Sequence, residues 1–344
     1  MSTADFATFS DNAVMFASIV YALAFLAHLT EWVLIRSLPA PQTTAEMAAQ
    51  TTAQAVVRDA VPVGGPAAGP TEPAVPVADP ASGREEEQEL RVEKYGRIGV
   101  ALTVLACALH LMALVSRGLG SDPIRVPWGN MYEFTLAGTF GVSVMYLLLL
   151  KRFELRWMGV LVTGFLVVVL MLDVLVLYQD AGPLVPALHS YWLAIHVLAA
   201  VIASGAFSVG ALTLVLFLAK DRAIRRGTLR PRGYLSRLPE APVLERVAYR
   251  MHAFGFPIWT FAALVAGPIW AEYAWGSYWN WDPKEVWAFI TWVIYAAYLH
   301  ARATAGWKGK AASVIALVGF ASLLFNFVGI NYFFGGGSLH SYAG

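Results

Sequence analysis

The residues of this chain best suited to chemistry are its histidines. There are seven of them: His28, His110, His189, His196, His252, His300 and His340. Neutral imidazole is a common metal ligand, and two imidazoles on opposite faces of a porphyrin make a six-coordinate iron site. The single cysteine, Cys107, cannot form an internal disulfide or a Cys-x-x-Cys pair. Any thiol–disulfide chemistry would therefore come from partner proteins.

Two of the histidines are predicted to lie at one level, near the same membrane face. His196 ends the motif PALHSYWLAIH at the start of an apolar segment, and His340 follows the last apolar segment and the glycines 335–337. We expect them to be able to bind one iron from opposite sides. His189 is an alternative ligand, because it precedes His196 by seven residues and the two could share a helical face.

His300 is predicted to lie at the other face. It follows Asp282 by 18 residues, about 27 Å along a helix at 1.5 Å per residue. A metal site at His300 would therefore be a second site, near the cytoplasmic face of the membrane. For His28, His110 and His252, a structural role as a buried imidazole bonded to a carbonyl is the simpler interpretation.

Half of the twelve tryptophans lie in one window, WAEYAWGSYWNWDPKEVWAFITW, at 270–292. An interfacial aromatic belt is one explanation. However, Trp275, Trp279 and Trp281 alternate with tyrosine, glycine and serine in a predicted outside loop, 271–281, that has no basic residue. Such a cluster can form a flat apolar surface, which suits a planar aromatic ligand.

The loop is followed by a predicted helix start. Asp282, Pro283 and Glu285 have the order of an N-cap, a proline at the first helical position and an acidic residue two positions later. We expect Asp282 to be a cap rather than a catalytic acid. Lys284 could pair with Glu285, reach the surface, or meet a ligand carboxylate.

These residues must be positioned by membrane-spanning helices. The 344 residues are 58% hydrophobic and 14% charged, with a mean hydropathy of +0.58, whereas a soluble domain has about 25% charged residues. The net charge of +1 gives no sign of a nucleic-acid partner. We predict an all-α integral membrane protein with about eight transmembrane helices, each about 20 residues long. The predicted spans are 12–35, 97–116, 130–150, 157–178, 191–219, 252–271, 284–301 and 311–333.

The distribution of basic residues predicts the orientation. Segment 220–250 has nine Lys and Arg residues, whereas 179–190, 271–283 and 334–344 have none. By the positive-inside rule the first segment is cytoplasmic and the other three are outside, so eight spans place both termini outside. Arg117 and Arg125 fall outside, against this trend. The N-terminus lacks a basic region, so we expect 12–35 to be a retained helix of a multi-pass plasma-membrane protein rather than a signal peptide.

The motifs together resemble a known family. WGSYWNWDPKEVWAFITW, continued by YLHAR, resembles the WWD signature of heme-handling proteins, of which the CcsA (ResC) type of cytochrome c biogenesis protein is most similar. Further similar motifs are PWGNMYEF at 127–134, LVPALHSYWLAIHV at 184–197 and the terminal LHSYAG. The resemblance covers about 95–344.

The resemblance implies a set of site residues. His196 and His340 resemble the two outer axial ligands of heme iron, and His300 resembles the transmembrane histidine of the family. Trp275, Trp279 and Trp281, with Asp282, resemble the surface that holds heme. The ligand implied is heme b, as a bound substrate. Hydropathy and composition predict an N-terminal transmembrane helix at 1–36 and a flexible Ala/Pro-rich cytoplasmic linker at 37–95. The resemblance implies that 96–344 is a heme-handling transmembrane domain with an outer WWD loop at 270–285.

The resemblance also implies partners and a reaction. The expected partners are a ResB-type protein, apocytochrome c, membrane lipid and, indirectly, thiol-reducing proteins. The function expected is that of a subunit of a holocytochrome c synthase, which presents heme outside for covalent attachment. The alternatives are a b-type electron-transfer cytochrome, and a transporter or structural subunit whose tryptophans only mark the interface. The source of a second ligand beside His300, in particular whether His28 or His110 supplies it, stays open.

Overall fold

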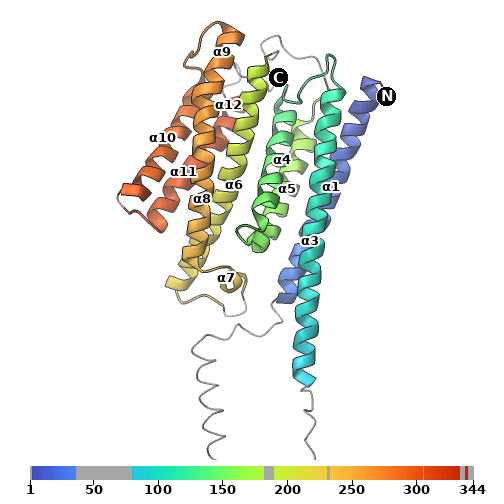
Figure 1. Cartoon of the computed structure of the whole chain (residues 1–344), viewed down its shortest axis with the longest axis vertical. Coiled ribbons are helices and arrows are strands. Elements are labelled where there is room, and N and C mark those ends of the chain that lie inside the picture. The colour runs from blue at the N-terminus through green and yellow to red at the C-terminus, as the bar shows by residue number, and fades with distance from the viewer. Residues whose placement is uncertain are drawn as a thin grey trace, which may run out of the picture.

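The computed structural model describes residues 2–35, 80–181, 190–230, 233–304, 306–333 and 338–339, and throughout these ranges the elements are helices (Figure 1). Their order is α1 (Thr3–Ile35), α3 (Pro80–Leu119), α4 (Met131–Leu150), η1 (Leu155–Met158), α5 (Gly159–Leu172), η2 (Asp173–Leu177), α6 (Tyr191–Arg225), α7 (Tyr234–Arg237), α8 (Ala241–Phe261), η4 (Ala262–Ala266), α9 (Gly267–Trp275), α10 (Pro283–Thr304), α11 (Lys310–Leu324), η5 (Phe325–Gly329) and α12 (Ile330–Phe333).

Seven stretches of the described residues are long and apolar enough to cross a membrane: 3–35, 86–119, 131–150, 155–177, 191–225, 241–275 and 310–333. They coincide with seven of the predicted spans. The eighth, 284–301, corresponds to α10, which has 22 residues and packs along α11. Its tryptophans, tyrosines and His300 make it less hydrophobic than the others. The prediction of an all-α multi-pass membrane protein is confirmed.

Two boundaries differ from the expected ones. Helix α3 begins at Pro80, inside the segment predicted as a linker, of which residues 37–79 lie outside the described ranges. Helix α9 extends to Trp275, so the predicted loop 271–281 begins as helix. The helix ends because Gly276 takes a left-handed conformation (φ +74°) and its N–H donates to the carbonyl of Glu272. We call residues 276–282 the tryptophan loop.

The helices stand side by side, from the α1–α3 pair on one side, through α4, α5, α6 and α8, to α10 and α11 on the other (Figure 1). Small residues allow close approach, as membrane helices require. A Cβ on Gly205 of α6, for example, would lie 3.0 Å from the carbonyl oxygen of Gly141 on α4.

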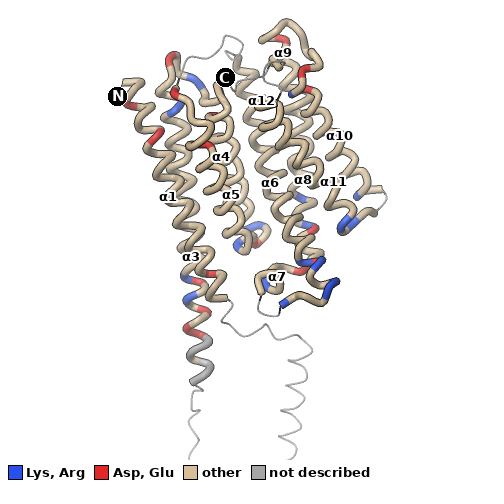
Figure 2. Tube along the Cα trace, turned by 180° about the vertical axis from the view of Figure 1, so that it is seen from behind, with Lys and Arg blue, Asp and Glu red and all other residues tan. Residues whose placement is uncertain are grey.

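The two ends of the bundle differ in charge (Figure 2). Lys and Arg gather at the end that carries α7 and the α10–α11 turn, which we call the basic end. The other end carries the tryptophan loop and the start of α1, and we call it the tryptophan end. This separation agrees with the pattern used to predict the orientation, which stays a prediction.

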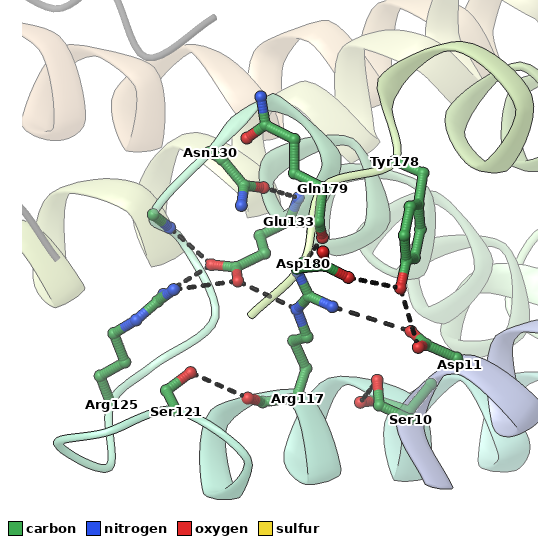
Figure 3. A network of polar contacts seen from close by, with 12 residues as sticks. Ser10, Asp11, Arg117, Ser121, Arg125, Asn130, Glu133, Tyr178, Gln179 and Asp180 are labelled. Carbon is green, nitrogen blue, oxygen red and sulfur yellow. Dashed lines mark hydrogen bonds and ion pairs between the residues drawn. The ribbon is translucent and has the colours of Figure 1, made fainter. Parts of the chain in front are cut away.

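The two arginines that broke the pattern, Arg117 and Arg125, are paired inside the protein (Figure 3). The Arg117 side chain is 1% exposed, and its Nε lies 3.1 Å from Oε1 of Glu133, a fully buried carboxylate on α4. Arg125 reaches both oxygens of the same carboxylate, at 2.6 and 3.0 Å. They are therefore not free positive charges at the tryptophan end.

Glu133 also explains the PWGNMYEF motif. Asn130 is the N-cap of α4, and its side chain accepts a hydrogen bond from the N–H of Glu133 at 2.9 Å. The Glu133 carboxylate in turn accepts the N–H of Gly129 at 2.7 Å. The motif thus fixes the start of α4 and connects it to α3 through Arg117.

We predict that Glu133→Ala strongly destabilises the protein, because it leaves two buried guanidinium groups without their carboxylate. The expected loss is about 3–5 kcal/mol in the free energy of unfolding, measured by denaturation in mixed micelles. The control is Glu93→Ala, which removes an exposed i,i+4 pair with Arg97 and should cost less than about 1 kcal/mol. Equal losses in the two variants would contradict this role of Glu133.

Candidate functional site

A cavity of about 250 Å³ lies at the tryptophan end, between α6, the α8–α9 junction, the start of α10 and the end of α11. Its wall is mostly apolar and aromatic. Both π-helical turns beside it, η4 and η5, contribute lining residues: Ala262 and Ala263 from the first, Asn326 and Phe327 from the second. Such turns often occur at functional sites, because they interrupt the regular i→i+4 bonding.

His196 lines this cavity and is held in a defined orientation. It lies in the second turn of α6, whose first turn is capped by Ser190. Its Nδ1 lies 2.9 Å from the carbonyl oxygen of Ala262 in η4. Because a carbonyl only accepts, Nδ1 carries the proton and Nε2 carries the lone pair. A backbone carbonyl that fixes the tautomer in this way is typical of histidines that bind metals.

The His196 ring is also enclosed by its neighbours. It stacks on the buried indole of Trp270, with 5.9 Å between centroids and 15° between planes. On the α9 side, a Cβ on Gly267 would lie 3.2 Å from the ring. Trp270 was part of the tryptophan window but was not singled out from the sequence. Its position at the end of an apolar segment gave no sign of this contact.

The three tryptophans predicted to form one surface have different positions. Trp279 lines the cavity together with Tyr278. Trp275 packs edge-on against Trp270, with 4.8 Å between centroids, and so supports the ring beneath His196. Trp281 is 73% exposed and lies edge-on to Trp279, outside the cavity wall.

The start of α10 has the cap that the sequence predicted. The Asp282 carboxylate accepts the N–H of Lys284 at 2.9 Å, and the Glu285 carboxylate accepts the N–H of Asp282 at 3.2 Å. Glu285 also accepts the N–H of Asn280 at 2.8 Å. It therefore binds the backbone on both sides of Trp281, which has a left-handed φ of +56°. This conformation is unfavourable for a bulky residue.

Side chains outside the predicted set of site residues also line the cavity. Lys284 and Glu285 both contribute to it, and so does Phe134 from the PWGNMYEF motif. Among the described lining residues Lys284 is the basic one, which makes it a candidate partner for an acidic group on a ligand. The order of cap residues could have located Lys284 near the cavity, but the sequence left its contacts open.

The C-terminal segment reaches the same place. The hydroxyl of Ser338 donates to Oδ1 of Asp282 at 2.8 Å, and the N–H of Leu339 donates to Oδ2 at 2.6 Å. His340 follows directly, but it lies outside the described residues, as does His189. The pairing of His196 with His340 on one iron therefore stays a prediction.

The remaining histidines lie elsewhere. His300 is exposed on α10 toward the basic end. His28, His110 and His252 are buried, and each has one ring nitrogen engaged: with Glu31 at 3.3 Å, the Leu136 carbonyl at 2.9 Å and the Ala248 carbonyl at 2.7 Å. For His110 and His252 this agrees with the interpretation of a buried imidazole bonded to a carbonyl, whereas the partner of His28 is a carboxylate. Helix α1, with His28, lies across the bundle from α10 (Figure 1). Among the described residues, no group of three or more His, Cys, Asp or Glu side chains could hold a metal ion.

The sequence is similar to known proteins over most of its length. The family model described as Cytochrome C assembly protein matches residues 128–336. A "Cytochrome c biogenesis protein CcsA" of Synechococcus sp. (strain JA-3-3Ab) is 34% identical, with 72% of this chain and 84% of that protein covered. The protein of the same description from Guillardia theta is 34% identical, with coverage of 71% and 85%. That from Chlamydomonas reinhardtii is 37% identical, with coverage of 63% and 60%.

We predict that Trp281→Gly gives a more stable protein than Trp281→Ala. Both variants lose the indole, but only glycine adopts the left-handed conformation without cost, so the difference should be about 1 kcal/mol. The measurement is thermal unfolding of the two variants in detergent. The exposed Tyr273 in helix α9 is the control, because there glycine should be the less stable replacement. The same order at both positions would argue against a left-handed Trp281.

Proposed function

This chain belongs to the cytochrome c assembly protein family, and on that basis we propose that it binds heme b as a substrate and presents it for covalent attachment to apocytochrome c. The observation that carries the proposal is the orientation of His196. In this tautomer Nε2 carries the lone pair that would bind iron, and the ring is fixed by Trp270 and the Ala262 carbonyl at the wall of an aromatic cavity. Heme is a planar, mostly apolar ligand that such a wall would suit.

The proposed arrangement has two axial ligands and an aromatic contact. His196 binds one face of the iron, and His340 binds the other. Trp279 and Tyr278 contact the porphyrin from the tryptophan loop, and Lys284 meets a propionate. The other two tryptophans have indirect roles: Trp275 supports Trp270, and Trp281 lies at the outer rim, where the apocytochrome approaches.

The proposed reaction is the addition of two thiols to the two vinyl groups of heme. In each addition, the cysteine sulfur bonds to the vinyl carbon next to the ring and a proton ends on the outer carbon. The reaction therefore has no net oxidation. The cysteines must be reduced, which assigns an indirect role to thiol-reducing proteins. The histidine of the apocytochrome then replaces one axial ligand. The work of the chain is to position the reactants, as a subunit of a holocytochrome c synthase.

We propose that the exposed face of α10 contacts the ResB-type partner. Phe289, Val293 and His300 are all exposed and recur at helical spacing along α10. An imidazole within the membrane is costly unless it has a polar or metal partner. A transmembrane histidine of the partner beside His300 would complete an inner heme site, from which heme is conveyed outward. In this scheme the basic end is cytoplasmic, both termini are outside, and the protein is in the plasma membrane.

His196→Ala and His340→Ala are each expected to remove the bis-histidine absorption bands of heme from the complex purified with its ResB-type partner. Added imidazole should restore the bands, because it supplies the missing ligand. His110→Ala is the control, because His110 is buried against Leu136, away from the cavity. Unchanged heme content in both variants would contradict the assignment of His196 and His340 as ligands.

The partner contact has its own test, disulfide cross-linking within the membrane. Val293→Cys is expected to cross-link to a series of cysteines placed along a transmembrane helix of the ResB-type partner. Leu23→Cys is the matched control, because it is similarly exposed but lies on α1, across the bundle. Cross-linking from Leu23→Cys and none from Val293→Cys would show that the partner contacts α1 and not α10.

A further inference from the structure

The Asp282 carboxylate makes more hydrogen bonds than a helix cap requires. It is almost completely buried, and among the described residues it accepts from the N–H of Lys284, from the hydroxyl of Ser338 and from the N–H of Leu339. Only the first of these caps α10. The other two donors come from a segment 56 and 57 residues further along the chain.

The tryptophan loop does not need these two bonds. Glu285 already binds the loop, through the N–H groups of Asn280 and Asp282. The two bonds from Ser338 and Leu339 therefore connect Asp282 to the C-terminal segment and do not serve to hold the loop. Asp282 accepts there with both oxygens, in bonds that are strong because the acceptor is charged.

The point of attachment lies at the rim of the cavity. Asp282 is two residues before Lys284 and three before Glu285, which both line the cavity. The backbone N–H of Leu339 is hydrogen-bonded to the Asp282 carboxylate. Successive Cα atoms of a chain are about 3.8 Å apart. The residue that follows Leu339 in the sequence is His340.

We propose that Asp282 is a positioning residue that fastens the C-terminal segment to the start of α10 and so sets the second axial ligand, His340. The inference rests on the proposed function and adds a separate role for this carboxylate, which contacts neither the iron nor the thiols. Because the fastening consists of hydrogen bonds, it can open when the histidine of the apocytochrome takes the place of His340. Each charge-assisted bond shifts such an opening equilibrium by about tenfold or more.

The experiment distinguishes the hydrogen bonds of Asp282 to the C-terminal segment from its capping of α10. Asp282→Ser keeps a capping hydroxyl for α10 but is too short to hold Ser338 and Leu339. Asn130→Ala is the matched control, because it removes a cap from α4 and leaves Asp282 intact. Two properties are measured on the complex purified with the ResB-type partner: deuterium uptake of the C-terminal peptide containing Leu339, and the absorption spectrum of the heme.

The expected result for Asp282→Ser is exchange at Leu339 at least about tenfold faster, with heme retained on His196. The spectrum should change from six-coordinate to five-coordinate and return on addition of imidazole. Asn130→Ala should alter neither property. Unchanged exchange in Asp282→Ser would overturn the fastening, and faster exchange with an unchanged spectrum would overturn its role in positioning His340. If the unmodified complex holds no heme, the proposed function and the positioning role fail together, while the exchange data still decide whether the segment is fastened.

Discussion

The start of a helix leaves backbone N–H groups without partners. At the tryptophan end, the side chains that accept from these groups in α10 and α4 also connect the two helices to neighbouring segments. In α10, Asp282 and Glu285 satisfy these groups, and the same two carboxylates bind the tryptophan loop and the C-terminal segment. In α4, Asn130 and Glu133 have the same spacing, and the Glu133 carboxylate binds Gly129 and two arginines. Both helices contribute side chains to the cavity. The two helices therefore begin with the same arrangement, an amide or carboxylate cap followed three residues later by a glutamate.

Much of this could be predicted from the residues, because it depends on local chemistry. Hydropathy gave the spans, and the order Asp282-Pro283-Lys284-Glu285 gave the start of α10. His196 lies at the tryptophan end, as its position near the start of a span suggested. The simple interpretation of His110 and His252 also agrees with the structure, where each donates to a backbone carbonyl. These features follow from patterns within about one helical turn or from average composition.

The features that escaped prediction depend on contacts between distant residues or on departures from regular geometry. The stacking of Trp270 on His196 needs the packing of α9 against α6. The carbonyl that orients His196 lies in a π-helical turn, which no local pattern announced. Arg117 and Arg125 looked like exceptions to the charge rule because burial cannot be read from the sequence, and Glu133 forms an ion pair with each of them. The contact of Asp282 with Ser338 spans 56 residues, so the cap was predicted while its second role was not.

The two proposed iron ligands stand on different parts of the chain. His196 lies within a 35-residue helix, with one nitrogen bonded to a carbonyl, one face on Trp270 and Gly267 beside it. His340 follows a segment that two side-chain bonds attach to Asp282. A protein that transfers heme must release it, and an attachment through the hydrogen bonds of Ser338 and Leu339 opens more readily than a helix of 35 residues. On the proposed function, the histidine of the apocytochrome therefore replaces His340, while His196 keeps the iron in place until both thioether bonds have formed.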